Sequence, residues 1–192
     1  MKKLLIAAAL GLAACLPASA ALLVGSSTTG ASVVADYSST GLISFDADLA
    51  SADSVRLDYE LTAGDLAAPL DFNAVVRNLT GTGLEHLYLM LSLSSFDSSG
   101  SVTRSFGGST QIDVNGGLAW LHFTPAEYLD IHIGDPLATG SATDWTLATA
   151  DLHAGDRLSI TVGAVPEPAS LALVLAALGL LGWTTLRSRS HS

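Results

Sequence analysis

Between residues 54 and 162, hydrophobic and polar side chains alternate with a period of two, and this pattern limits the fold of the chain more than any other feature. Val55, Leu57, Tyr59 and Leu61 alternate with Arg56, Asp58 and Glu60, and the same pattern recurs in residues 70–77, 87–93 and 158–162. Successive side chains of a strand point to opposite faces, so each segment predicts a strand with one buried and one solvent-facing side.

Turn-forming residues separate the alternating segments. Asn115-Gly116-Gly117 lies between residues 111–114 and 118–123, and Asn-Gly supplies the positive φ values that a tight hairpin requires. Residues 80–83, Thr-Gly-Thr-Gly, predict a second hairpin that joins residues 70–77 to residues 87–93. Asn78-Leu79-Thr80 has the form of a glycosylation acceptor, but we expect Asn78 to start a turn and Thr80 to bond within it.

Together with residues 32–37 and 42–48, these segments predict about eight to ten short strands and no convincing amphipathic helix between residues 21 and 164. Residues 125–129 are the one stretch with the composition for a short helical turn. Such a pattern predicts an all-β domain, an antiparallel β-sandwich of residues 21–164, with a β-barrel as the alternative.

The first 20 residues have the composition of an export signal. Lys2 and Lys3 precede the apolar residues 4–16, and small residues follow, which predicts cleavage by signal peptidase between Ala20 and Ala21, with Ala18 in the recognition site. The alternative is a lipoprotein signal, Leu-Ala-Ala-Cys, in which Cys15 is lipidated. Cys15 is the only cysteine, so ordinary cleavage leaves a mature protein without thiol chemistry or disulfides.

The last 28 residues form a tail of a different kind. Val165-Pro166-Glu167-Pro168 predicts an extended, exposed segment, because each proline fixes φ and removes a donor. Residues 169–186 carry no charge, and as a helix they would span roughly 27 Å, close to the hydrocarbon thickness of a bilayer. A basic tail, residues 187–192, follows, in which Arg187 and Arg189 predict a stop on the cytoplasmic side of the membrane.

This order of Pro-Glu-Pro, apolar span and arginines resembles the PEP-CTERM sorting signal of Gram-negative bacteria, over residues 165 to about 189. The same segment is also catalogued as an ice-binding protein C-terminal domain, although the one Thr-x-Thr motif in the chain, Thr80-Gly81-Thr82, lies in a predicted turn. The resemblance implies that an exosortase, a membrane cysteine-type transpeptidase, recognises Pro166-Glu167-Pro168 and hands the protein to the cell surface or the exopolysaccharide matrix. Family tails often end in a denser arginine cluster, whereas here Ser188 separates the two arginines.

Between the two terminal segments the chain is strongly acidic. All 18 carboxylates lie between Asp36 and Glu167 against four arginines, a net charge of −14, and both lysines lie in the predicted signal peptide. Such a surface repels nucleic acid and anionic lipid. Weak calcium binding is the one metal expectation, because Asp46, Asp48, Asp144, Asp151 and Asp156 offer oxygen ligands, but the EF-hand spacing is absent.

No motif predicts catalysis or a resident cofactor. The histidines His86, His122, His132 and His153 each stand alone in sequence, and we expect His86 and His122 to be half-exposed strand residues. There is no Gly-x-Ser-x-Gly elbow, and the many carboxylates make any single glycosidase pair arbitrary.

The sequence therefore predicts a non-catalytic adhesion or matrix-binding sandwich. It would begin as a precursor anchored in the inner membrane of a Gram-negative bacterium and end at the cell surface or in the extracellular matrix. The alternatives are an extracellular hydrolase that acts on polysaccharide and a lipoprotein tethered through Cys15.

Overall fold

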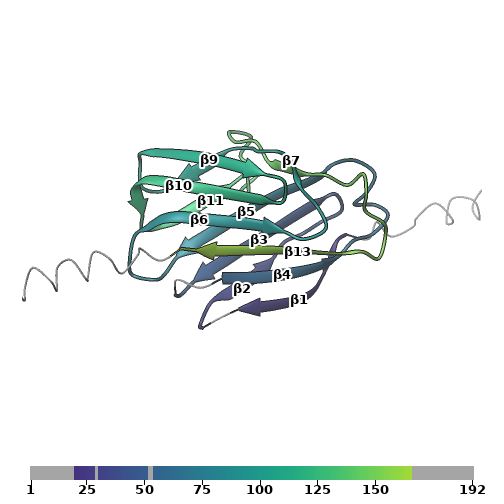
Figure 1. Ribbon diagram of the computed structural model, residues 1–192, viewed down its shortest axis with the longest axis horizontal. Coiled ribbons are helices and arrows are strands. Elements are labelled where there is room, and N and C mark those ends of the chain that lie inside the picture. Colours follow the sequence, from purple (N-terminus) through teal and green to yellow (C-terminus); the bar gives the residue numbers. More distant parts are fainter. Residues whose placement is uncertain (1–19, 29, 52–53, 166–192) are drawn as a thin grey trace, which may run out of the picture.

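A computed structural model describes residues 20–28, 30–51 and 54–165, which fold into two β-sheets packed face to face (Figure 1). Strands are the regular elements of this part of the chain, and the two sheets do not close into one barrel. The predicted all-β sandwich is thereby confirmed over the barrel alternative. The predicted signal helix and the predicted membrane helix, residues 169–186, lie outside the described residues.

The described residues form thirteen strands, more than predicted because three of them, β7, β8 and β12, are only three residues long. Sheet A has six strands in the order β1 (Leu22–Thr28), β4 (Ser54–Glu60), β13 (Arg157–Ala164), β6 (Leu84–Leu91), β10 (Leu118–Glu127) and β9 (Ser109–Asn115). Sheet B has the order β2 (Val33–Asp36), β3 (Leu42–Leu49), β5 (Leu70–Asn78), β11 (Asp130–Ile133) and β8 (Val102–Arg104), while β12 (Trp145–Leu147) pairs with both β5 and β7 (Phe96–Ser98).

The hydrophobic core lies between the sheets and consists of the inward-facing half of each alternation. Phe72 and Trp145 of sheet B and Tyr59 of sheet A are among its largest fully buried side chains. The Trp145 indole Nε1 donates to the carbonyl of Ser101 at 3.1 Å, and the Tyr59 hydroxyl donates to Asp36 Oδ1 at 3.0 Å. Their polar atoms are thus satisfied. Burial raises the pKa of the Tyr59 hydroxyl far above its ordinary value, which keeps it a donor.

The chain enters the sandwich at one end and leaves it at the other. Leu22 at the start of β1 and Arg157 at the start of β13 both lie opposite Glu60 of β4. From there β13 runs along the sheet to Ala164, as its arrow shows in Figure 1. We call the end at which β13 finishes, next to Val165, the C-terminal end of the sandwich.

The hairpin predicted at Asn115-Gly116-Gly117 is confirmed. Asn115 pairs with Leu118, so Gly116 and Gly117 form a two-residue loop between β9 and β10. Gly116 has a φ of 57°, in the left-handed region that favours glycine. This loop fixes the register of the two strands along their whole length.

The second predicted hairpin is wrong, because β5 and β6 lie in different sheets. β5 pairs with β3, β11 and β12, whereas β6 pairs with β10 and β13. Residues 79–83 therefore carry the chain from sheet B to sheet A. The alternation reports which side of each strand is buried but not which strand lies beside it. The β3–β5 pair is also parallel, so sheet B is mixed rather than purely antiparallel.

The turn between these two strands forms as expected from its sequence. Asn78 Oδ1 accepts hydrogen bonds from the backbone N–H of Thr80 at 3.1 Å and from its hydroxyl at 2.7 Å. Asn78 Nδ2 donates to the carbonyls of Thr82 at 2.6 Å and Glu127 at 2.9 Å. Asn78 is buried, and its bond to Glu127 holds the crossover against strand β10.

The short helical turn considered for residues 125–129 is absent, because residues 125–127 complete β10. The pairing of β10 with β6 shifts register between His122 and Glu127. Glu127 is fully buried, and its carboxylate accepts hydrogen bonds from three backbone N–H groups, those of Phe106, Tyr128 and Leu129. These bonds hold the chain extended as it turns toward β11.

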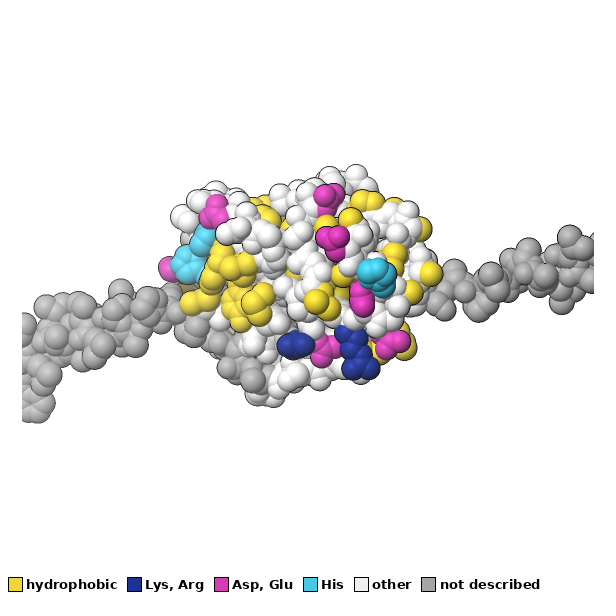
Figure 2. Space-filling model, turned by 45° about the vertical axis from the view of Figure 1, so that its right-hand side comes forward, with side chains coloured by type: hydrophobic (Ala, Val, Ile, Leu, Met, Phe, Trp, Pro, Cys, Tyr) yellow, Lys and Arg dark blue, Asp and Glu magenta, His cyan; other side chains and the backbone are white. Residues whose placement is uncertain are grey.

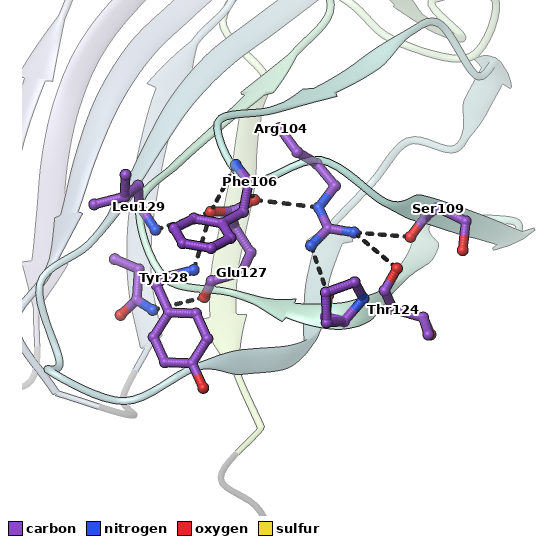
Figure 3. A network of polar contacts seen from close by, with 9 residues as sticks. Arg104, Phe106, Ser109, Thr124, Glu127, Tyr128 and Leu129 are labelled. Atoms are coloured by element: carbon purple, nitrogen blue, oxygen red, sulfur yellow. Dashed lines mark hydrogen bonds and ion pairs between the residues drawn. The ribbon is translucent and has the colours of Figure 1, made fainter.

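The Glu127 carboxylate is neutralised by Arg104 of β8, at 3.2 Å from Nε to Oε2 (Figure 3). The two side chains are 4% and 0% exposed. The remaining guanidinium nitrogens donate to three backbone carbonyls, those of Ser109, Thr124 and Pro125. Because β8 belongs to sheet B and β10 to sheet A, this satisfied ion pair joins the two sheets at the C-terminal end of the sandwich.

Arg104→Met is expected to destabilise the sandwich by about 3–5 kcal/mol, because it leaves the Glu127 carboxylate buried without its counter-charge. The measurement is equilibrium denaturation of residues 21–165. The control is Arg157→Met. Arg157 lies 3.9 Å from Glu60, and the two side chains are 70% and 44% exposed, so this substitution should change stability by less than about 1 kcal/mol. Equal losses for the two variants would contradict this role of Arg104.

Candidate functional site

A group of aromatic and histidine side chains lies on the outer side of sheet A. In the pairing of the strands, Gly163 of β13, Tyr88 of β6, Trp120 of β10 and Asp113 of β9 form one row across the sheet. The next row contains His86, His122 and Gln111. We call Tyr88, Trp120, His86 and His122 the aromatic face.

The four rings of the aromatic face form a continuous series. The Tyr88 and Trp120 centroids are 5.6 Å apart, and Trp120 is stacked on His122 at 6.2 Å with an interplanar angle of 13°. His86 meets the edge of His122 at 4.9 Å. All four residues are partly exposed. Histidine side chains lie beside a hydrophobic patch on the side of the molecule shown in Figure 2.

Gly163 provides the space in which Tyr88 lies. A Cβ atom at this position would come within 2.4 Å of Cζ and 2.5 Å of the hydroxyl oxygen of Tyr88. The tyrosine ring therefore extends across the neighbouring strand β13 instead of standing away from the sheet. Any side chain larger than hydrogen at residue 163 would displace it.

Polar groups border the rings on the β9 side. Gln111 Nε2 donates to the Asp113 carboxylate at 3.0 and 3.2 Å, and Asp113 Oδ2 lies 3.2 Å from His122 Nε2. His122 Nδ1 lies 2.8 Å from His86 Nδ1. With Nε2–H of His122 donating to Asp113, His86 donates from Nδ1 and keeps Nε2 as an acceptor. The border thus offers both donors and acceptors to a ligand.

The histidines stand alone in sequence, but the fold brings two of them together. His86 and His122 are 36 residues apart and become partners only through the β6–β10 register. Their expected half-exposed strand positions are confirmed. His153 lies on an exposed loop, where its backbone N–H donates to Asp156, and His132 lies on β11 in the other sheet.

The acidic residues considered for calcium are scattered, and most of them already have partners. Asp46 and Asp48 both face the guanidinium of Arg77, and Asp48 in particular raises the pKa of Arg77. Asp144 Oδ1 accepts from Asn73 Nδ2 at 3.1 Å and from the backbone N–H of Asp135 at 2.6 Å, while Asp151 and Asp156 lie on the β12–β13 loop. Within the described ranges, no three acidic, histidine or cysteine residues are arranged to hold a metal ion.

A pocket of about 480 Å³ lies where the described chain begins, and it is lined by Ala20, Ala21, Leu22, Leu23, Asp36, Ser38, Glu60 and Thr62. It contains two carboxylates. That of Asp36 accepts hydrogen bonds from the hydroxyls of Tyr59 and Ser38, at 3.0 and 2.7 Å. The Glu60 carboxylate lies 3.9 Å from the Arg157 guanidinium. Both carboxylates therefore already have partners within the sandwich.

Of the residues predicted for processing, the structure describes Ala20, Ala21 and Val165. Ala21 is buried at the edge of the core, next to Ala20, and the N–H of Val165 donates to the carbonyl of His86 at 3.2 Å. Ala18, Cys15, Arg187, Arg189 and the motif residues Pro166, Glu167 and Pro168 lie outside the described residues. The part of the chain that the structure describes contains no helix long and apolar enough to span a membrane.

These observations define a class of protein, an all-β domain followed at once by a C-terminal sorting tail. Residues 164–190 match the family model of the PEP-CTERM protein-sorting motif. The chain therefore carries this motif, which indicates an exported, membrane-anchored precursor that an exosortase system processes and sorts to the cell surface. The ice-binding label is not part of this match. Comparisons with the curated proteins and with the solved structures gave no match.

The Asp71 carboxylate on β5 has a raised pKa, because of its partial burial and the nearby charge of Asp144. A raised folded-state pKa favours the protonated form, so stability is lost as the pH rises through that pKa. Asp71→Asn should therefore increase stability at pH 7 and change it little at about pH 3. Urea denaturation at both pH values tests this expectation. The exposed Glu85→Gln serves as the control, and an equal gain at both pH values would contradict the charge-based explanation.

The sorting motif predicts the fate of a precursor with an altered tail. Glu167→Gln should leave the uncleaved chain in the membrane fraction, because the carboxylate between the two prolines is the proposed recognition element. Removal of residues 169–192 should release the domain in soluble form. Cell fractionation and immunoblotting measure both outcomes, with Glu85→Gln as the matched control. Normal surface processing of Glu167→Gln would refute this role of the carboxylate.

Proposed function

We propose that the sandwich is a non-catalytic, surface-displayed domain that binds a neutral polysaccharide of the extracellular matrix through the aromatic face. The observation that carries this proposal is the continuous series of four partly exposed rings, bordered by the Gln111–Asp113 pair. A pyranose ring has an apolar C–H face and a rim of hydroxyl groups, and an aromatic platform with polar borders complements both.

The position of the rings supports binding rather than packing. Trp120 and Tyr88 project from the side of sheet A that faces away from the core, where alternation normally places charged or polar residues. Aromatic side chains present large rigid contact areas at low entropic cost, and they dominate recognition surfaces. The space that Gly163 leaves for the Tyr88 ring is a further sign that the surface is shaped for a flat ligand.

Charge favours a neutral polymer as the ligand. The body of the protein carries a strong excess of carboxylates, which repels polymers rich in uronic acid or phosphate. On the aromatic face the Asp113 carboxylate is shared between Gln111 and His122 and can accept hydrogen bonds from sugar hydroxyls. We therefore assign the ligand to the neutral hexose polymers.

The location completes the proposal. We place the precursor in the inner membrane of a Gram-negative bacterium, after signal peptidase has cut between Ala20 and Ala21, and the mature domain at the surface or in the exopolysaccharide matrix. The rival lipoprotein pathway predicts a lipidated Cys15 as the first residue. Mass spectrometry of the mature N-terminus separates the two, since a chain that starts at Ala21 excludes lipidation.

The rival hydrolase would place its chemistry in the pocket that contains Asp36 and Glu60. In that case the polysaccharide bound by the protein would release reducing ends, and Asp36→Asn together with Glu60→Gln would abolish the release. We favour a binding role because both carboxylates already have partners within the sandwich.

Trp120→Ala should weaken binding to the neutral exopolysaccharide of the producing organism at least about tenfold, or 1.4 kcal/mol, because it removes the central ring of the series. Affinity electrophoresis and isothermal titration calorimetry measure the change. Tyr37→Ala is the matched control, because Tyr37 is 61% exposed on a loop at the other end of the sandwich. Equal binding by wild type, Trp120→Ala and Tyr37→Ala would remove the basis of the proposal.

A further inference from the structure

Four large apolar side chains are exposed together at the C-terminal end of the sandwich. Leu79 is 57% exposed, Phe106 48%, and Tyr128 and Leu129 51% each. They come from three connections, β5–β6, β8–β9 and β10–β11, all of which lie at the end where β13 finishes. We call these four residues the apolar tip.

The apolar tip is held in place by the buried network beneath it (Figure 3). The backbone N–H groups of three of its members, Phe106, Tyr128 and Leu129, donate to the Glu127 carboxylate. The fourth member, Leu79, follows Asn78, whose N–H donates to the carbonyl of Leu129. The buried carboxylate thus satisfies the polar backbone while the side chains point outward.

Two members of the apolar tip are in direct contact with each other. The rings of Phe106 and Tyr128 are 5.8 Å apart between centroids. Tyr128 also lies across the β5–β6 connection, where a Cβ atom on Gly83 would come within 2.8 Å of its Cζ. At the other end of the sandwich, the exposed apolar residues Tyr37, Leu93 and Leu137 lie on three separate connections, and Leu22 lies at the start of β1.

The two ends of the sandwich also differ in charge. Among the described residues, the connections 79–83, 105–108 and 128–129 that form the apolar tip contain no charged side chain. The acids that follow these connections in sequence are the half-exposed Asp130 of β11 and the exposed Glu85 of β6. The connections at the opposite end carry four carboxylates that are at least partly exposed, Asp135, Asp144, Asp151 and Asp156. The apolar tip can therefore approach a membrane with less repulsion than the opposite end would experience.

The chain leaves the sandwich beside the apolar tip. The N–H of Val165 is bonded to β6, and the uncharged run of the sorting tail starts four residues later at Ala169. Four residues span at most about 14 Å. The interfacial layer on one side of a bilayer is roughly 5–8 Å deep, so in the anchored precursor the C-terminal end of the sandwich lies within reach of the headgroups.

We propose that the apolar tip inserts into the interfacial layer of the membrane that anchors the precursor. Tyrosine and phenylalanine at the boundary between headgroups and acyl chains, without basic residues, match a surface held by apolar insertion rather than by charge. The contact holds the sandwich upright on the bilayer and keeps the Pro-Glu-Pro motif at the membrane surface. Loss of the tail ends it, because the tip alone provides few buried side chains. The proposal rests on the anchored precursor and is independent of polysaccharide binding.

The test places an environment-sensitive fluorophore at single cysteines in the full-length precursor, in a Cys15→Ala background. The precursor is reconstituted in phosphatidylcholine vesicles. Phe106→Cys and Leu129→Cys report on the apolar tip, and Leu137→Cys, at a position 63% exposed in the other end of the sandwich, is the control. We expect a blue-shifted emission that nitroxide-labelled lipids quench at residues 106 and 129, and the emission of a water-exposed probe at residue 137.

Three results would overturn the proposal. The probes at residues 106 and 129 could report water as the control does, all three could be quenched equally, or the tip could be shielded only after an exosortase is added, which would assign it to the enzyme. Thermal unfolding of each labelled chain confirms the fold, and residue 129 replaces residue 106 if Phe106→Cys does not fold. Polysaccharide binding by the same preparations shows whether the proposed function fails separately.

Discussion

The ion pair between Arg104 and Glu127 is the constraint on which the C-terminal end of the sandwich depends. The Glu127 carboxylate is removed from water, so it requires a counter-charge and a full set of donors, and it has both. In meeting that requirement the carboxylate fixes the extended end of β10 and the start of the β8–β9 connection. The backbone carbonyl of the same residue accepts a hydrogen bond from Asn78 Nδ2 and so holds the crossover between the sheets. One buried residue, Glu127, thereby sets the relative position of three connections that are distant in sequence.

Much of the architecture follows from local sequence, and its failures have a physical reason. The alternation predicted the buried side of most strands, and Asn115-Gly116 predicted the β9–β10 hairpin, because both signals act over a few residues. The predicted β5–β6 hairpin was wrong because β5 pairs with β3, a strand far away in the chain. The predicted helical turn at residues 125–129 was wrong because Glu127 is buried against Arg104 of another strand. The sorting tail is defined by its composition and by the order of its motif, apolar run and arginines, so it was identified from sequence alone.

The aromatic face shows how far sequence can lead toward a site. Trp120 and His122 occupy outward positions of a predicted strand, and the Asn-Gly turn is sufficient to place Asp113 opposite Trp120. A tryptophan on the wet side of a strand is therefore a signal that was present in the sequence. The other half of the face, Tyr88 and His86, joins it only through the β6–β10 register, which spans an intervening excursion into the other sheet. The space left by Gly163 is visible only once β13 lies beside β6.

The chain enters the sandwich at one end and leaves it at the other, so copies anchored side by side in one membrane would all point the same way. Strands of up to ten residues make the domain about 33 Å tall. Copies tethered by their C-terminal ends would all present the connections with Asp135, Asp144, Asp151 and Asp156 outward, as the charged outer layer of a brush. Because screening reduces repulsion beyond about 8 Å at physiological salt, these layers would set a minimum lateral spacing between neighbours and leave gaps through which a neutral polymer can reach the sides of the molecules.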